Sequence, residues 1–147
     1  MKTVLQLLKE KPESHQAVLT IGPDQSVLDA LRLMAQINVG ALPVVEQGQV
    51  VGVVSERDYA RKMVLLGRSS AGTPVRSIMN APVITVGPGE TLERCMNIMT
   101  DSHLRHLPVV ERGELIGLLS IGDLVKAAIA EQAQLIGQLE QYIRGEH

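Results

Sequence analysis

Two places in the chain present a serine and an aspartate with the spacing Ser-x-x-Asp, namely Ser55 with Asp58 and Ser120 with Asp123. Each pair ends a run of aliphatic residues and opens a segment with helical periodicity, as in GLLSIGDLVK. The first backbone N–H groups of a helix have no intrahelical partner and lie at the positive end of its dipole, which favours a phosphate oxygen there. The serine hydroxyl can donate to the same phosphate, and the carboxylate can accept hydrogen bonds from a ribose diol. The two pairs are therefore candidate nucleotide contacts.

The spacing has a second interpretation, since Ser-x-x-Asp also predicts a capping box in which both side chains bond to the backbone of the helix start. A further example, Ser26 with Asp29, occurs where no ligand is suspected. Spacing alone favours capping. The nucleotide interpretation gains support because the pair recurs at the same place in two copies of a longer segment, directly after a glycine-containing strand.

Those copies form an internal duplication, in which residues 18–62 match residues 83–127 without a gap. Each copy predicts a short strand ended by Gly-Pro, a helix, two strands joined by a tight Gln-Gly or Arg-Gly turn, and a second helix. Ser26 and Thr91 are the expected caps of the first helices. A unit of this size buries only about 60 % of its unfolded surface and is marginal alone, so the copies should share one core. The predicted fold class is α/β, with two tandem β-α-β-β-α repeats packed pseudo-symmetrically.

The duplication also predicts how the chain is divided. We expect a lead-in helix and the first repeat over residues 1–66, a linker and the second repeat over residues 67–130, and a C-terminal helical extension over residues 131–147. Residues 4–8 and 75–82 are expected to be short helical lead-ins to the first and second copies. An apolar stripe continues past the second repeat, and it indicates either a helix folded back on its own domain or a dimer contact.

Composition narrows the function classes. The formal net charge is −2, so no broad positive field attracts DNA or an anionic membrane. The single cysteine, Cys95, lies among apolar helical positions, where a small core residue is expected rather than a nucleophile. With one cysteine and no apolar run near the roughly 20 residues that span a bilayer, we expect a cytoplasmic protein. His103 and His106 lack further ligands for a closed zinc site, so no metal is expected.

Two longer stretches carry a family resemblance: RHLPVVERGELIGLLSIGDLVK (residues 105–126) and SERDYARKMVLLGRSS (residues 55–70). They resemble cystathionine-β-synthase (CBS) domains, and the tandem copies resemble a Bateman module over roughly residues 4–130. The motifs are specific because two full copies occur. The chain further resembles stand-alone CBS-pair proteins of bacteria and plants, which carry no attached enzyme or transporter.

The resemblance implies two clefts that bind adenosine compounds: AMP, ADP, ATP, and in some members NAD or S-adenosylmethionine. In the family, the junction serine and aspartate contact phosphate and ribose, backbone near the first strand contacts adenine, and the stretch before Leu-Pro contacts phosphate. The first copy departs from this pattern before Leu-Pro, where it has glycine and alanine. Arg57, beside a helix start, is a further phosphate candidate. The candidate nucleotide-binding residues are Val18, Thr20, Gly40, Ala41, Ser55, Arg57, Asp58, Val83, Thr85, Arg105, His106, Ser120 and Asp123.

The copies differ in charge around these residues. Basic groups at Arg57, Arg61, Lys62 and Arg105 are candidates to surround an anionic ligand tail, while the junction at Asp123 brings no positive charge of its own. We therefore expect two unequal sites. Which cleft receives Arg105 depends on how the copies face each other, and a solvated helix face is the alternative role for Arg61 and Lys62.

Together these features predict a regulatory sensor of adenosine nucleotides that is not an enzyme, forms a homodimer and signals its ligand state to an unidentified partner protein. The main alternative is a protein-interaction module with vestigial nucleotide sites, for instance one that binds a redox regulator, because similar plant proteins are associated with thioredoxin regulation. Two further alternatives are an enzyme, for which His106 is the only candidate base, and an RNA-binding protein that uses the basic stretch of residues 57–76.

Overall fold

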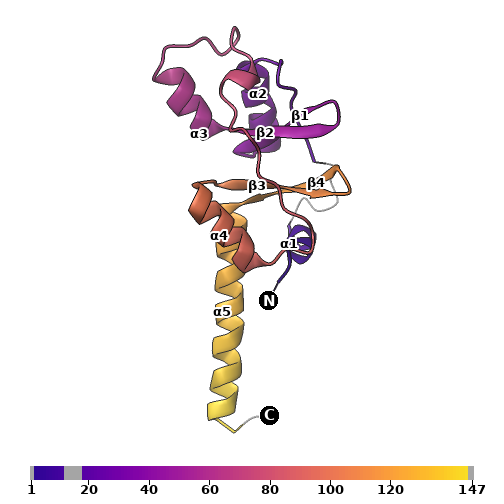
Figure 1. Cartoon of the computed structure of the whole chain (residues 1–147). Helices are drawn as coiled ribbons and strands as arrows, with labels where there is room; N and C mark the ends of the chain where they lie inside the picture. The colour runs from indigo at the N-terminus through magenta and orange to yellow at the C-terminus, as the bar shows by residue number, and fades with distance from the viewer. Residues whose placement is uncertain (1, 12–17, 146–147) are drawn as a thin grey trace.

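The computed structural model of the 147-residue chain describes residues 2–11 and 18–145. The first half of the chain forms α1 (Val4–Glu10), α2 (Val27–Ile37), β1 (Ala41–Glu46), β2 (Gln49–Ser55), α3 (Glu56–Tyr59) and the π-helical segment η1 (Ala60–Val64). The second half forms the short 3₁₀ helix η2 (Val75–Ser77), α4 (Leu92–Ser102), β3 (His106–Glu111), β4 (Glu114–Ser120) and α5 (Ile121–Ile143). Figure 1 shows the two hairpins next to each other in the body of the molecule, with α5 extending from it. The predicted α/β class with two repeated units is confirmed.

The two hairpins repeat each other in detail. β1 pairs with β2 and β3 pairs with β4, both antiparallel, and both ladders shift register at the equivalent position. The turn residues Gln47 and Gly48 have φ values of 50° and 78°, and Arg112 and Gly113 have values of 52° and 81°. Positive φ at both turn positions gives a turn whose twist matches the twist of the strands, and it explains why glycine follows in each turn. The predicted Gln-Gly and Arg-Gly turns are confirmed.

The expected first strand of each repeat is reduced to a single bridging residue. Ile21 forms a parallel bridge with Val44, and Val86 occupies the equivalent position in the second repeat. The ladder cannot continue because Gly-Pro follows each bridging residue and proline has no N–H to donate. Residues 18–20 and 83–85, which precede the bridging residues, form no ladder either and are unpaired segments rather than strands.

The first helix of each repeat begins and ends at related residues. Ser26 caps α2 and Thr91 caps α4, and each side-chain oxygen accepts a hydrogen bond from an amide of the first helical turn. Both predicted caps are confirmed, although only the serine half of the capping box with Asp29 is formed. Each helix ends at a residue in the left-handed conformation, Asn38 or His103, which turns the chain into the next strand.

The two lead-in segments are exchanged between the repeats. Val4 and Leu7 of α1 are buried in the core of the second repeat, whereas Val75 and Ile78 of the linker are buried in the core of the first. Backbone hydrogen bonds fix the exchange, as where Val4 N donates to Glu90 O at 2.8 Å. Each core is therefore completed by a segment that precedes the other repeat, which the sequence did not predict. The division of the chain between residues 66 and 67 stays a prediction.

α5 leaves the body of the molecule before it ends (Figure 1). Its last buried residue is Ala127, and we call the following residues, 128–143, the stalk. The interpretation of a helix folded back on its own domain is wrong for the stalk, whose large apolar residues from Ile129 onward are exposed. Within the described part of the chain, no helix combines the length and the apolar character that crossing a bilayer requires.

Two candidate ligand clefts between the repeats

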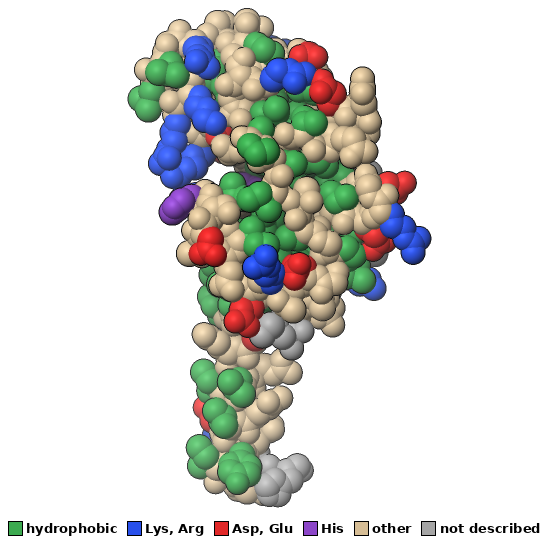
Figure 2. Space-filling model, viewed as in Figure 1, with side chains coloured by type: hydrophobic (Ala, Val, Ile, Leu, Met, Phe, Trp, Pro, Cys, Tyr) green, Lys and Arg blue, Asp and Glu red, His purple; other side chains and the backbone are tan. Residues whose placement is uncertain are grey.

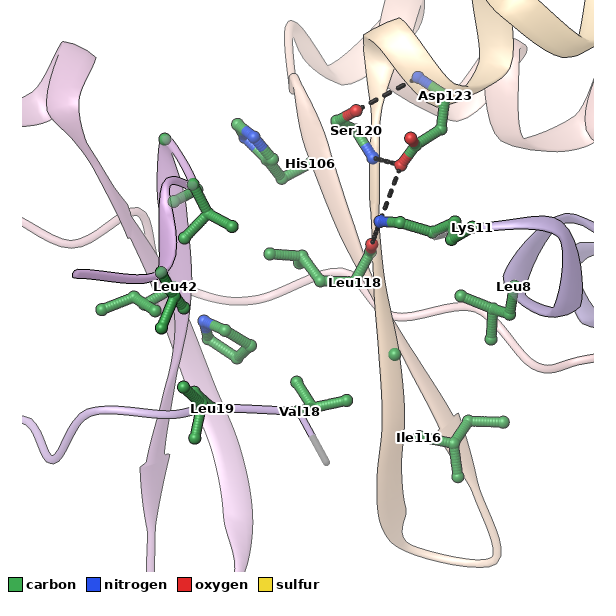
Figure 3. A pocket seen from close by; sticks show the side chains of 16 residues that line it. Leu8, Lys11, Val18, Leu19, Leu42, His106, Ile116, Leu118, Ser120 and Asp123 are labelled. Carbon is green, nitrogen blue, oxygen red and sulfur yellow. Dashed lines mark hydrogen bonds and ion pairs between the residues drawn. The ribbon is translucent and has the colours of Figure 1, made fainter. Parts of the chain in front are cut away.

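Two cavities open between the repeats, and each combines the strand–helix junction of one repeat with wall segments of the other. The cavity at Ser55 and Asp58 has a volume of about 510 Å³, and we call it the basic cleft. The cavity at Ser120 and Asp123 has a volume of about 350 Å³, and we call it the apolar cleft (Figure 3). Each junction follows the second strand of its hairpin, so the β2 and β4 ladders determine where both sites lie.

Most of the candidate nucleotide-binding residues line one of these cavities. The basic cleft is lined by Gly40, Ser55, Arg57, Asp58, Val83, Arg105 and His106. The apolar cleft is lined by Val18, Gly40, Ala41, His106, Ser120 and Asp123. Thr20 and Thr85 line neither cavity and are exposed. The way the repeats face each other thus places Arg105 in the cavity at Ser55 and Asp58. A role of the candidate residues in nucleotide binding stays a prediction.

Both junctions form capping boxes. At the first, Ser55 N donates to Asp58 Oδ2 at 3.0 Å, and Asp58 N donates to Ser55 Oγ at 3.1 Å. At the second, Ser120 N donates to Asp123 Oδ2 at 2.8 Å, and Asp123 N donates to Ser120 Oγ at 3.1 Å. The capping interpretation is confirmed at both places. Any ligand contact must therefore use atoms that capping leaves available.

Capping also reduces what the helix starts offer to an anion. Glu56 N, the first amide of α3, donates to Gly40 O at 3.0 Å, and Ile121 N makes the equivalent bond at 2.9 Å in the second repeat. The third amide of each helix is bonded to the serine. The expectation that the first amides are free is therefore wrong for two of the first three. The second amide of each helix belongs to Arg57 or Gly122. Among the described residues, this amide donates no hydrogen bond to a carbonyl or serine oxygen of the junction.

The exchanged lead-in segments contribute polar groups to both junctions. Lys11, directly after α1, donates to Asp123 Oδ2 at 3.0 Å. Asn80, in the linker, donates to Asp58 Oδ2 at 3.5 Å, and Lys62 Nζ lies 3.4 Å from Asp58 Oδ1. Sequence reasoning missed Lys11 and Asn80 because both lie outside the duplicated segments and reach the junctions only through the exchange. No sequence signal identified them.

The two carboxylates differ in what they leave for a ligand. Asp58 is only 6 % exposed, and both of its oxygens have protein partners. The Asp123 side chain is 23 % exposed, and its bonds from the described residues all go to Oδ2. Oδ1 of Asp123 is thus available to a hydroxyl donor. At Asp58, the partly exposed Lys62 has to move before a ligand can reach Oδ1.

Positive charge gathers around the basic cleft. Its lining includes Arg57, Arg61 and Arg105, and Figure 2 shows blue side chains beside a histidine on that side of the body. Desolvation, followed by the charges of Arg105 and Arg61, lowers the pKa of the Arg57 guanidinium, and Asp58 opposes the shift. These groups therefore repel one another in the ligand-free protein.

No carboxylate forms an ion pair with any of these three arginines within residues 2–11 and 18–145. Arg76 shows the contrast, because hydrogen bonds to Glu46, at 2.6 Å, and to Asp24 raise its pKa. Clustered guanidinium groups without a carboxylate partner are well suited to an anionic ligand, to which they can form charge-assisted hydrogen bonds.

The apolar cleft has a different lining. Figure 3 shows aliphatic side chains such as Leu8, Val18 and Leu118 on the two sides of the cavity. The charged groups in its described lining are Lys11 and Asp123, and they pair with each other. The cleft therefore offers mainly apolar surface with little uncompensated charge. The two cavities are unequal, as the difference between the copies predicts.

His106 lines both clefts, as does Gly40. Burial lowers the pKa of His106 below its ordinary value of 6.5, and the carboxylates of Asp123 and Asp58 oppose this shift. The imidazole is therefore neutral at pH 7 and has one donor and one acceptor nitrogen. Within the described residues, no three His, Cys, Asp or Glu side chains are grouped to hold a metal ion.

Comparison with known proteins gives a consistent match. The family model for the CBS domain matches residues 14–65 and 75–130. The CBS domain-containing protein CBSX3, mitochondrial, of Arabidopsis thaliana is 40 % identical over 149 aligned positions, which cover 97 % of this chain and 72 % of the relative. The CBS domain-containing protein YhcV of Bacillus subtilis is 38 % identical over 107 positions, covering 73 % and 76 %. A solved structure of a protein with CBS domains from Burkholderia ambifaria superposes with a TM-score of 0.82 at 50 % identity, covering 89 % of this chain and 96 % of that one.

Proposed function

The chain belongs to the CBS domain family, and from that premise we propose that it binds adenosine nucleotides between its repeats and signals their presence to an unidentified partner protein. CBS pairs are regulatory modules that often bind adenosine ligands. AMP, ADP, ATP and NAD are the candidate ligands. The proposed role is binding without a catalytic step, in a cytoplasmic homodimer.

The observation that carries the proposal is the set of unpaired arginines beside the first junction. Arg57, Arg61 and Arg105 line one cavity and repel one another, and no carboxylate of the described residues forms an ion pair with them. A phosphate chain bound among them would relieve this repulsion and accept charge-assisted hydrogen bonds. Because the attraction to three guanidinium groups grows with the negative charge of the phosphate chain, we expect ADP and ATP to bind the basic cleft more tightly than AMP.

The same phosphate would also change the carboxylate at the junction. Lys62 Nζ lies 3.4 Å from Asp58 Oδ1 and donates to Ile78 O at 2.9 Å, and its side chain is 39 % exposed. A bound phosphate attracts Lys62, which frees Oδ1 to accept a ribose hydroxyl while Oδ2 continues to cap α3. Backbone groups near Val83 then remain for the adenine. Phosphate and ribose binding are thereby coupled through Lys62.

The apolar cleft supports a weaker version of the same site. Asp123 Oδ1 is available to a ribose hydroxyl, and Lys11 is the charged group that could meet a phosphate. Lys11 already pairs with Asp123, so a phosphate gains less there than among three arginines. We expect nucleotides with several phosphates to prefer the basic cleft.

The test is a calorimetric titration of the purified chain with AMP, ADP, ATP and adenosine. Arg105→Gln removes one cation from the basic cleft and should weaken ADP binding by about tenfold or more, because a charge-assisted hydrogen bond contributes roughly 1.5–3 kcal/mol. Arg94→Gln is the matched control, since Arg94 is an exposed arginine on α4 outside both cavities. It should leave ADP affinity unchanged.

Two results would contradict the proposal. One is the absence of binding by these four compounds and by NAD, titrated in the same way, at millimolar concentration. The other is an equal loss of affinity in Arg105→Gln and Arg94→Gln, which would indicate a general charge effect. Signalling further requires that the ligand bind two conformations with different affinity, because a ligand shifts an equilibrium only by that difference.

A protein-interaction module with vestigial clefts is the second candidate. The exposed apolar residues of the stalk favour it, since a contiguous apolar surface of this kind marks an interaction site. In that case the chain would show its partner contacts without any adenosine ligand, and substitutions in the basic cleft would leave them unchanged.

A further inference from the structure

The stalk and the turn of α5 directly before it have the residue spacing of a coiled-coil seam. Isoleucines recur every seventh residue, and apolar or amide residues lie between them in alternating steps of three and four. The seam residues, in order, are Val125, Ile129, Gln132, Ile136, Leu139 and Ile143. This places isoleucine at each a position of a heptad and valine, glutamine and leucine at the d positions, which is a pattern that favours pairing of helices.

The seam is exposed to solvent and confined to one side of the helix. Ile136, Leu139 and Ile143 are 56 %, 53 % and 82 % exposed. Figure 2 shows the hydrophobic side chains gathered along the stalk. Leu135 and Tyr142, each directly before an isoleucine of the seam, widen the apolar side. The positions that face away from the seam include Gln134, Gln138 and Gln141. One side of α5 is therefore apolar and uncovered over its outer turns.

The outer turns of the stalk have little support from the body. Lys2 N donates to Glu131 Oε1 at 2.9 Å, and beyond Glu131 the large apolar side chains of α5 are more than half exposed. Helices shorter than about 12–15 residues are marginal alone in water, and residues 132–143 fall at that limit. A packed seam would supply the missing stabilisation.

We propose that the stalk pairs with the stalk of a second copy of this chain, in antiparallel orientation. The orientation follows from the two charged residues that flank the seam, Lys126 and Glu140, which occupy the same heptad position. Along one helix they lie about 21 Å apart and cannot meet. In the antiparallel pair, Ile129 packs against Leu139 of the second copy, and Lys126 then faces Glu140 of the second copy at both ends.

A parallel pair offers no such match. In that arrangement Lys126 lies level with Lys126 of the second copy, and Glu140 with Glu140, so neither cation meets a carboxylate. Neither residue forms an ion pair within the described part of the chain. The charges that flank the seam are thus complementary only to an antiparallel second copy. The inference rests on the homodimer of the proposed function and names the surface that forms it.

The first test measures self-association of the full chain by sedimentation equilibrium. Ile136→Glu introduces a charge at the centre of the seam and should weaken dimerisation by about a hundredfold or more, because an unpaired buried charge is strongly unfavourable. Gln138→Glu carries the same new charge outside the seam and should change the dissociation constant by less than about threefold. A monomeric wild type, or a dimer that is equally stable in Ile136→Glu, overturns the proposal.

The second test addresses orientation. Lys126→Glu and Glu140→Lys each replace two attractive pairs by two repulsive ones, so each should weaken the dimer by roughly tenfold. The double variant Lys126→Glu/Glu140→Lys restores both pairs with reversed charges and should recover wild-type affinity. Failure of the double variant to recover it overturns the antiparallel arrangement.

Nucleotide binding is measured separately on the Ile136→Glu variant. Both clefts lie in the body of the molecule, so ADP should raise the melting temperature of this variant as it does that of the wild type. Dimerisation lost in Ile136→Glu together with no ADP response in either protein would leave stalk pairing standing and remove the nucleotide proposal. If the wild type is monomeric but its melting temperature rises with ADP, the nucleotide proposal stands and stalk pairing is removed.

Discussion

Asp58 is held by the capping box of α3, by Asn80 and by Lys62. We therefore predict that Asp58→Ala lowers the free energy of unfolding by about 1–3 kcal/mol before any ligand is added, because the Asp58 half of the capping box is lost and Ser55 N is left buried without its acceptor. Urea unfolding measures the change. Asp29→Ala is the control, since the side chain of Asp29 does not complete its box, and it should change the stability by less than about 0.5 kcal/mol. Equal losses in both variants would contradict the capping role.

The capping role of Asp58 and Asp123 affects how ligand-binding experiments on the junctions must be interpreted. A substitution of Asp58 or Asp123 lowers the melting temperature with or without a nucleotide site, because both carboxylates cap helices. Only the difference between the liganded and ligand-free melting temperatures of one variant reports binding. Arg105, which makes no ion pair among the described residues, is for that reason the cleaner probe of the basic cleft.

His106 should make the stability of the fold depend on pH. Burial lowers the pKa of His106 in the folded chain below 6.5, so the unfolded chain binds a proton first as the pH falls. The contribution of the neutral imidazole to stability is then complete above about pH 6.5 and is lost as the pH falls toward the folded pKa. We predict that His106→Gln flattens the melting temperature between about pH 7 and pH 5 relative to wild type. An unchanged slope in His106→Gln would show that other groups cause the pH dependence.

At the scale of the elements, two glycines allow the exchanged lead-ins to approach the strands. A Cβ on Gly52 of β2 would lie 2.8 Å from Asn80 O, whereas a Cβ on Gly117 of β4 would lie 2.6 Å from Leu8 Cδ2. Asn80 O is backbone and accepts a hydrogen bond from Val53 N at 3.2 Å, so it cannot move without loss of pairing. Leu8 can change its rotamer.

We therefore predict that Gly52→Ala destabilises the fold by about 2–3 kcal/mol and Gly117→Ala by about 1 kcal/mol, within the range known for overpacked sites. Urea unfolding of the two variants measures the difference. Gly137→Ala in the stalk, where an added Cβ meets no atom within 4 Å, is the control and should be neutral or slightly stabilising. A smaller loss in Gly52→Ala than in Gly117→Ala would be inconsistent with the fixed backbone contact.

The elements also show what sequence reasoning can and cannot predict here. The hairpins and helix caps were predictable because each depends on neighbouring residues, such as the glycine at position 48 or the serine at position 26. The length of the first strand in each repeat was overestimated, since only the residue before Gly-Pro forms a bridge to the neighbouring hairpin. The candidate site was largely predictable where it lay inside the duplication. Lys11 and Asn80 were not, because an apolar lead-in such as residues 4–8 fits either core and its sequence carries no sign of which one it enters.

At the scale of the whole molecule, exchange and cleft formation have one cause. Each cavity takes its junction from one repeat and its wall from the other, and each core takes its lead-in from the segment preceding the other repeat. A ligand in either cleft therefore contacts both repeats at once. Because His106 and Gly40 line both cavities, a ligand that moves either residue changes the second cavity as well.

The exchange gives a last prediction, about which pieces of the chain fold. A fragment of residues 1–66 lacks Val75 and Ile78, two fully buried side chains of its core. It should be unfolded by circular dichroism, as should a fragment of residues 67–147, which lacks Val4 and Leu7. Mixed in equal amounts, the two fragments should regain a cooperative melt, because each then provides the segment that the other lacks. A cooperative melt of residues 1–66 alone would show that the first repeat needs no segment from beyond residue 66.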